Sequence, residues 1–222
     1  MKQKRNLIII GSAIVSMAIL CCPLYALDFK QIIEKAASGD MDAQFKLALM
    51  YDAGDGVPRN VAESIKWMRK AAEQGYPSAQ NVLGNTYAAG GEYVEKNVVE
   101  ALKWYRRAAE QGNTEAQSNM GKAYTNGDGV SKDSVEAVKW YRKAAEQGNA
   151  VAQFNLGLCF GKGDGVEMDK QQAVFWIRKS AEQGYARAES LLGDCYAAGS
   201  GVEKDLTQAA LWHYKATNHG SK

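Results

Sequence analysis

The sequence predicts an all-α protein, an α-solenoid of about five antiparallel helix-pair repeats with a period of 36 residues. Two observations predict it. Five tryptophans recur at spacings of 37, 36, 36 and 36 residues, and each is followed eight residues later by a glycine. The stretch WYRRAAEQG at 104–112 returns in close copies, and four of those five glycines close the tetrapeptide AEQG. Such a period is typical of repeats that bury their apolar sides against their neighbours.

The first half of each repeat has the pattern of a helix with four aligned columns. Within a repeat, each column follows the previous one after four, one and three residues, and this spacing puts all four columns on one helical face. Alanine or glycine in the third column would let a neighbouring helix approach closely. The columns are Ala43, Ala79, Ala116, Ala152 and Ala188; Leu47, Leu83, Met120, Leu156 and Leu192; Ala48, Gly84, Gly121, Gly157 and Gly193; Tyr51, Tyr87, Tyr124, Phe160 and Tyr196.

A glycine-rich turn and a second helix complete each repeat. The turns contain GDGV or GSGV, except for a longer one at Gly90–Val94. The second helix carries the tryptophan, which we interpret as core, and ends where glycine supplies a left-handed residue. A residue suited to N-capping precedes each second helix: Asn60, Asn97, Asp133, Asp169 and Asp205. The array spans 39–222, with repeats at about 39–74, 75–111, 112–147, 148–183 and 184–220.

Two segments precede the array. Residues 1–26 have the parts of a secretory signal peptide, namely a basic start, the apolar run Leu7–Leu20 and a boundary at Ala26. That run is shorter than the roughly 20 residues that cross a membrane, so we expect cleavage and no stable membrane span afterwards. Residues 27–38 should form an N-terminal capping helix, in which Gln31 stands where a tryptophan would.

An acylated lipoprotein is the alternative for this leader, because Cys21 and Cys22 follow the apolar run. Lipoprotein signals normally place small residues before the acylated cysteine, whereas Ile19 and Leu20 stand here. The favoured localisation is therefore an exported protein, periplasmic or secreted.

Charge argues against a nucleic-acid partner. Of the 27 basic residues three lie in the leader, which has no acid, so the rest of the chain carries 24 basic and 25 acidic residues. A near-balanced chain without a basic run lacks the electrostatic footprint of nucleic-acid binding. We expect a monomer.

The combined pattern A-x-x-x-L-G-x-x-Y, then G-x-G-V, then A-x-x-W-Y-x-x-A-A-E-Q-G resembles the Sel1-like repeats, relatives of the tetratricopeptide repeats with a longer interhelical loop. The resemblance covers about residues 39–220 in five copies. It implies an adaptor for protein complexes, and for exported bacterial members a link to host interaction or the cell envelope. We therefore expect an exported interaction scaffold without catalytic activity, whose partner is a protein or peptide.

An envelope enzyme or a peptidoglycan-binding protein is the alternative, because cysteine-rich relatives are associated with penicillin binding or β-lactamase activity. Serine β-lactamase chemistry needs S-x-x-K and K-T-G, and neither string occurs here. Only Cys159 and Cys195 remain after processing, at matching positions of consecutive repeats. Stacked helices lie roughly 8 to 10 Å apart, beyond the reach of a disulfide, so we expect two free, largely buried thiols.

We expect neither a metal nor a cofactor. His213 and His219 are six residues apart, whereas a two-histidine helical metal site needs a spacing of three or four. We interpret them as frayed surface residues. The GDGV turns lack the calcium ligand ladder, and Gly157–Gly163 lacks phosphate-loop spacing.

The candidate partner-binding residues lie on the first helices, opposite the column of Leu47. In tetratricopeptide-like arrays the first helices line the concave surface. Apolar residues stand there where a solvated face would be polar, and both partner contact and burial by an adjacent helix explain them. We expect Phe154 to lie outside the repeat core, and the polar candidates to bind a peptide or helix laid along the groove. The candidates are Phe45, Leu49, Asn81, Asn85, Lys122, Phe154, Leu158 and Asp194.

Overall fold

The computed structural model describes residues 23–220, and every regular element within that range is a helix. The eleven helices of this range are α2 (Pro23–Ala37), α3 (Met41–Ala53), α4 (Val61–Glu73), α5 (Pro77–Ala89), α6 (Val98–Glu110), α7 (Thr114–Asn126), α8 (Ser134–Glu146), α9 (Ala150–Lys162), α10 (Lys170–Glu182), α11 (Ala186–Ala198) and α12 (Leu206–Gly220).

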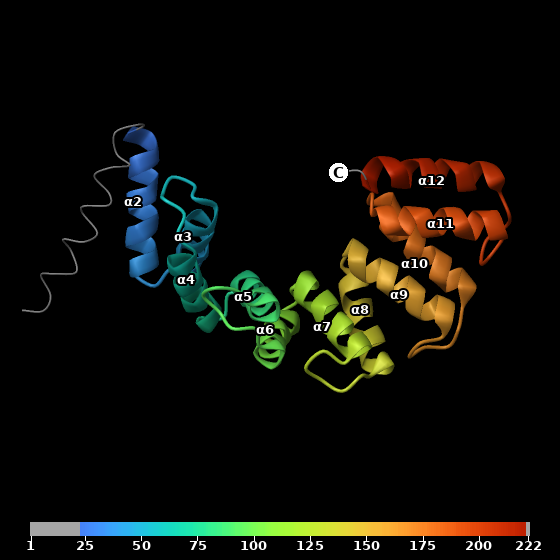
Figure 1. Ribbon diagram of the computed structural model, residues 1–222, viewed down its shortest axis with the longest axis horizontal. Helices are drawn as coiled ribbons and strands as arrows, with labels where there is room; N and C mark the ends of the chain where they lie inside the picture. The colour runs from blue at the N-terminus through green and yellow to red at the C-terminus, as the bar shows by residue number, and fades with distance from the viewer. Residues whose placement is uncertain (1–22, 221–222) are drawn as a thin grey trace, which may run out of the picture.

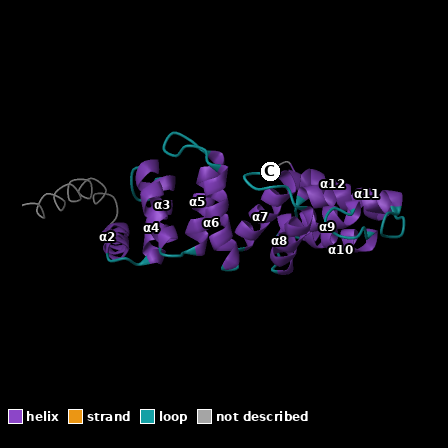
Figure 2. Ribbon diagram, turned by 90° about the horizontal axis from the view of Figure 1, so that it is seen from below, coloured by secondary structure: helices purple, strands orange, loops and turns teal. Residues whose placement is uncertain are grey.

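The helices form an open, curved array that runs from α2 at one end to α12 at the other (Figure 1). After α2, each odd-numbered helix packs against the next even-numbered helix as a pair, and each pair packs against the next pair. Figure 2, turned by 90°, shows the same stack with loops as connections between helices. The predicted all-α solenoid is confirmed.

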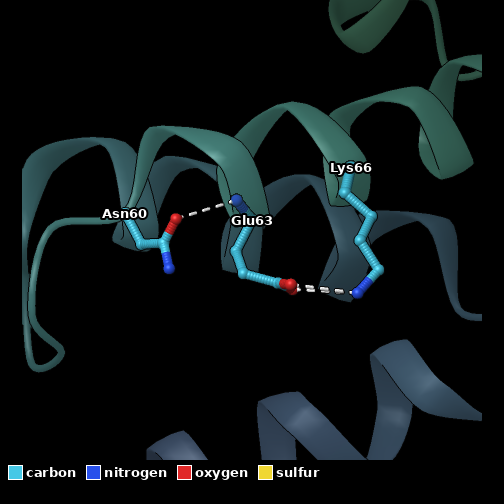
Figure 3. Close-up of polar contacts among 3 residues, drawn as sticks. All are labelled: Asn60, Glu63 and Lys66. Atoms are coloured by element: carbon cyan, nitrogen blue, oxygen red, sulfur yellow. Dashed lines mark hydrogen bonds and ion pairs between the residues drawn. The ribbon is translucent and has the colours of Figure 1, made fainter. Parts of the chain in front are cut away.

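The predicted caps are present at the second helices. In α4, Asn60 accepts a hydrogen bond from the Glu63 backbone N–H at 3.1 Å, and Glu63 in turn pairs with Lys66 at 3.0 Å (Figure 3). An asparagine or aspartate caps α6, α8, α10 and α12 in the same way. These bonds satisfy backbone donors that a helix leaves unpaired at its start.

The core follows the predicted columns. The large residues of the second column, led by Leu47 and Leu83, are fully buried. Four of the five tryptophans are buried, and Trp67 is half-buried, so the interpretation of these residues as core is confirmed. A cation three residues later covers each ring, with 4.0 to 5.3 Å between the charged atom and the ring centroid: Lys70, Arg107, Lys143, Lys179 and Lys215.

The glycine column exists for close packing. A Cβ atom built on Gly84 would lie 2.6 Å from the Tyr105 ring, and one on Gly121 would lie 2.6 Å from the Tyr141 ring. A real Cβ atom does not come this close to a ring atom, so α6 and α8 approach their partner helices more closely than alanine would allow. In the first repeat the same column holds Ala48, which is fully buried. Burial raises the pKa of Tyr105 and of Tyr141 to about 12.

Buried glutamines link each repeat to the preceding one. A glutamine near the start of each of the first four odd-numbered helices from α3 donates its side-chain N–H to an alanine carbonyl eight residues earlier, at 3.0 to 3.1 Å. Its own carbonyl oxygen accepts from a second glutamine at the end of the next helix, at 2.6 to 2.8 Å. The pairs are Gln44–Gln74, Gln80–Gln111, Gln117–Gln147 and Gln153–Gln183.

The last repeat replaces this pair by Glu189 and His219. The Glu189 side chain is 1% exposed, and His219 Nδ1 lies 2.9 and 3.0 Å from its two carboxylate oxygens. His213 packs its ring over Gly193, and its Nε2 lies 3.5 Å from Asp194. Both histidines lie at the surface as expected, with side chains 42% and 44% exposed, but the expectation that they are frayed is wrong, because both hold α12 to α11.

The thiols of Cys159 and Cys195 are both free, as predicted. Cys159 is buried and Cys195 half-buried. Burial, reinforced by the nearby Asp164 carboxylate, raises the pKa of the Cys159 thiol to about 11. A protonated thiol is a poor nucleophile, so Cys159 packs as a small apolar residue.

The leader stays a prediction, because residues 1–22 lie outside the described part of the chain. The helix α2 begins at Pro23, so the expected processing boundary at Ala26 falls within its first turn. Across residues 23–220, no helix combines the length and apolar character needed to cross a bilayer.

Candidate partner-binding face

The odd-numbered helices from α3 to α11 are the first helices of their pairs, and we call the surface that they present the first-helix face. Between α5 and α7, the Asn119 side-chain amide donates to Asn81 at 3.2 Å and to Asn85 at 3.3 Å. Asn81 donates to the Glu115 carboxylate at 2.9 Å, and α7 also contacts α9. The junction between α5 and α7 is therefore lined by side chains from both helices.

The first junction, between α3 and α5, is apolar. The Phe45 ring lies 5.0 Å from the Tyr76 ring, and both pack with Val82 against one buried cluster. Leu49, one turn after Phe45, is 44% exposed. Val82 holds the position that Asn119 holds one repeat later. We call Phe45, Leu49, Tyr76 and Val82 the first apolar junction.

The last junction, between α9 and α11, repeats this arrangement. The Phe154 ring lies 5.3 Å from the Tyr185 ring in an edge-to-face contact. Leu158 and Leu191 are half-buried and pack against the same cluster. The Arg187 guanidinium lies 5.3 Å from the Phe154 centroid. We call Phe154, Leu158, Tyr185 and Leu191 the second apolar junction.

Phe154 corrects one expectation from the sequence. The side chain is 5% exposed and belongs to the largest buried cluster, so it is not outside the core. Of the two explanations left open for it, burial by an adjacent helix is the one observed. Phe45 is half-buried by the same kind of contact. The accessible apolar surface of the two junctions therefore comes from Leu49, which is exposed, and Leu158, which is half-buried.

Asn81 is also less available than expected. It is 2% exposed and uses both ends of its amide within the fold. Asn85 is exposed, but its carbonyl oxygen accepts from Tyr105 at 2.7 Å and from Asn119. The two central junctions are thus polar, with exposed Lys122 in the second of them. Asp194 is exposed beside His213 at the far end.

Four residues of the two apolar junctions were not predicted from the sequence: Tyr76, Val82, Tyr185 and Leu191. A signal for two of them was present. Tyr76 and Tyr185 stand where α7 and α9 have the capping residue Asn113 or Asn149, and α5 and α11 accordingly lack a side-chain cap. In both places the preceding first helix carries a phenylalanine, Phe45 or Phe154. A tyrosine at the cap position therefore indicates an apolar contact instead of a capping bond.

Comparison with known proteins identifies the class. The Sel1 repeat model matches residues 42–76, 77–113, 114–149, 150–185 and 186–221, and the chain belongs to the Sel1 repeat family. Proteins of this family generally serve as interaction scaffolds, and their solenoid is typically non-enzymatic.

Two solved structures share the fold at substantial identity. One is c5321, "a protective antigen present in uropathogenic Escherichia coli strains displaying an SLR fold", with 40% identity, a TM-score of 0.80, and 88% of this chain covered. This chain spans 41% of that protein. The other is a Sel1 repeat protein from Oxalobacter formigenes, with 36% identity, a TM-score of 0.78, and coverage of 86% of this chain and 82% of that one.

A shorter similarity is to the "Exopolysaccharide production negative regulator" of Rhizobium meliloti (strain 1021). The two sequences are 40% identical over 58 residues, which is 25% of this chain and 22% of that protein.

Proposed function

We propose that this protein is an exported scaffold that binds a segment of a partner protein along the first-helix face, the concave side of the solenoid. One observation carries the proposal. The four junctions of that face are apolar, polar, polar and apolar in order, with Leu49 and Leu158 accessible at the two apolar ones. Binding energy concentrates in a few positions that desolvate well, and two such positions separated by polar ones suit a peptide with two apolar anchors.

The spacing of the two apolar junctions defines the length of that segment. They are three repeats apart, and stacked units advance by about 10 Å each, so the anchors lie roughly 30 Å apart. An extended chain advances about 3.3 Å per residue. The two anchor residues of the partner segment are therefore about nine positions apart in sequence if it binds in extended form.

Replacement of Leu49 by glutamate should weaken partner binding by at least about tenfold, equivalent to about 1.4 kcal/mol, because it places a charge in an apolar contact. The thermal midpoint should change little, since this leucine is already 44% exposed. The partner is recovered by affinity capture from envelope and culture fractions, and its affinity for each variant is measured by calorimetry.

The control is Val99→Glu, which introduces the same charge at an exposed position on α6. It should leave the affinity unchanged. Equal losses for the two variants, or no loss for Leu49→Glu, would contradict the assignment of the first-helix face.

Export predicts a defined N-terminus. The basic start, short apolar run and Ala26 boundary should be processed, so the mature chain should begin at Leu27 and occur in the soluble periplasm or the medium. Intact-mass measurement of the purified native protein checks this. Retention of residues 1–26, or an acyl chain on Cys21 or Cys22, would show that the leader works differently.

A further inference from the structure

A small pocket of about 110 Å³ opens between the third and fourth repeats. Its walls come from the end of α7, the start of α8 and the second half of α9. The apolar part of the lining includes Leu158, which also belongs to the second apolar junction. The pocket therefore adjoins the surface on which the proposed partner segment lies.

Hydrogen-bond donors dominate the polar lining. Lys132 and Lys162 are exposed at the pocket, and neither has an ion-pair partner among the described residues. Ser134 and Asn155 add a hydroxyl and an amide. Asp164 is the one carboxylate of the lining. Two ammonium groups against one carboxylate leave a local excess of positive charge.

Tyr141 supplies a buried donor. It is 3% exposed, and its hydroxyl lies 3.3 Å from that of Thr125, which already donates to the Gly121 carbonyl at 2.9 Å. Its counterpart Tyr105 donates to an asparagine oxygen at 2.7 Å. In the third repeat Lys122 replaces that asparagine, and an ammonium group cannot accept. The Tyr141 hydroxyl thus has only a long contact, which an anionic acceptor would improve on.

These donors differ from the residues at the equivalent positions one repeat earlier, between the second and third repeats. The pocket has Thr125, Ser134 and Lys162. The equivalent positions one repeat earlier hold Ala88, Val98 and Asn126. Each of these changes adds a hydroxyl or a positive charge. The helices pack in the same way at both repeat boundaries, so packing does not require these polar residues.

We propose that this pocket binds the side-chain carboxylate of an aspartate or glutamate in the partner segment, next to the apolar residue that contacts Leu158. The inference rests on the proposed function, because it assigns one side chain of the segment bound along the first-helix face. A carboxylate accepts several hydrogen bonds and forms short, charge-assisted bonds with ammonium donors, which matches the lining.

The test uses random dodecapeptides displayed on phage through their C-terminal ends, so that no free terminal carboxylate is present. They are selected on the mature protein. Recovered peptides should carry an aspartate or glutamate at a fixed spacing from an apolar residue. In a synthetic, C-terminally amidated copy, changing that acid to its amide should weaken binding at least about tenfold.

Matched variants locate the effect. The double variant Lys132→Gln with Lys162→Gln should remove the preference for the acidic peptide over its amide, whereas Lys96→Gln, at the position equivalent to Lys132 in the second repeat, should keep it. Tyr141→Phe should reduce the preference and Tyr105→Phe should not. Thermal melts of all variants check that each is folded.

The outcomes separate the two proposals. Failure to recover any peptide would overturn both. Recovery of peptides with apolar anchors but no acidic preference would overturn the pocket assignment alone. An acidic preference that survives the double lysine substitution in a folded variant would also overturn it.

Discussion

Trp140→Ala is expected to lower the free energy of unfolding by about 3 to 5 kcal/mol, as removal of a large core side chain does. Trp140 is buried in a central cluster with Met120 and Tyr105, which come from two different repeats. Loss of the indole therefore weakens contacts across a repeat boundary as well as within one. Urea denaturation monitored by circular dichroism measures the change.

Trp212→Ala provides the comparison. Trp212 lies in the last described helix, α12, which packs against α11. In a solenoid each repeat is stabilised through its neighbours, so a substitution with a neighbour on one side should cost less than one in the centre. Equal denaturation midpoints for the two variants would argue against stability through nearest-neighbour stacking.

His219→Ala should destabilise the last repeat by about 2 kcal/mol, because it leaves the Glu189 carboxylate buried without its partner. The figure is moderate because the His219 side chain is 44% exposed, so water can partly replace its contact with the carboxylate. The double variant Glu189→Gln with His219→Gln restores the pair found in the four preceding repeats and should recover most of the loss.

The matched control for this pair is Gln183→Ala, which removes the equivalent partner of Gln153 one repeat earlier. It should cost less than His219→Ala, because the group left behind is neutral. Hydrogen exchange of the α12 amides, together with the unfolding free energy, distinguishes local opening from global loss. A double glutamine variant no more stable than His219→Ala would show that the charges do not control this contact.

The fold could be predicted because the repeat constrains it many times over. The tryptophan spacing defined the repeat, the capping residues located the starts of the second helices, and the glycine column indicated close packing against the next helix. Each inference rested on several copies of one pattern. The free thiols of Cys159 and Cys195 followed from the same stacking argument.

The surface could be predicted only in part. A helical periodicity gives the direction of a side chain relative to its own helix, but not the position of the next repeat. Phe154 points away from Leu156 on its own helix and is nevertheless covered by Tyr185. The histidine pairing had a readable signal, since Glu189 and His219 occupy the two glutamine columns. The pocket beside Tyr141 depends on distances that no sequence pattern supplies.

The most direct test of partner binding on the first-helix face is site-specific photo-crosslinking in the presence of the captured partner. A photoreactive residue is placed singly at positions 49, 122 and 158 on that face, and at 99, 175 and 211 on the exposed parts of the second helices. Crosslinks to the partner at the first three positions and none at the other three is the predicted result. Crosslinks confined to the second helices would show that the partner binds elsewhere.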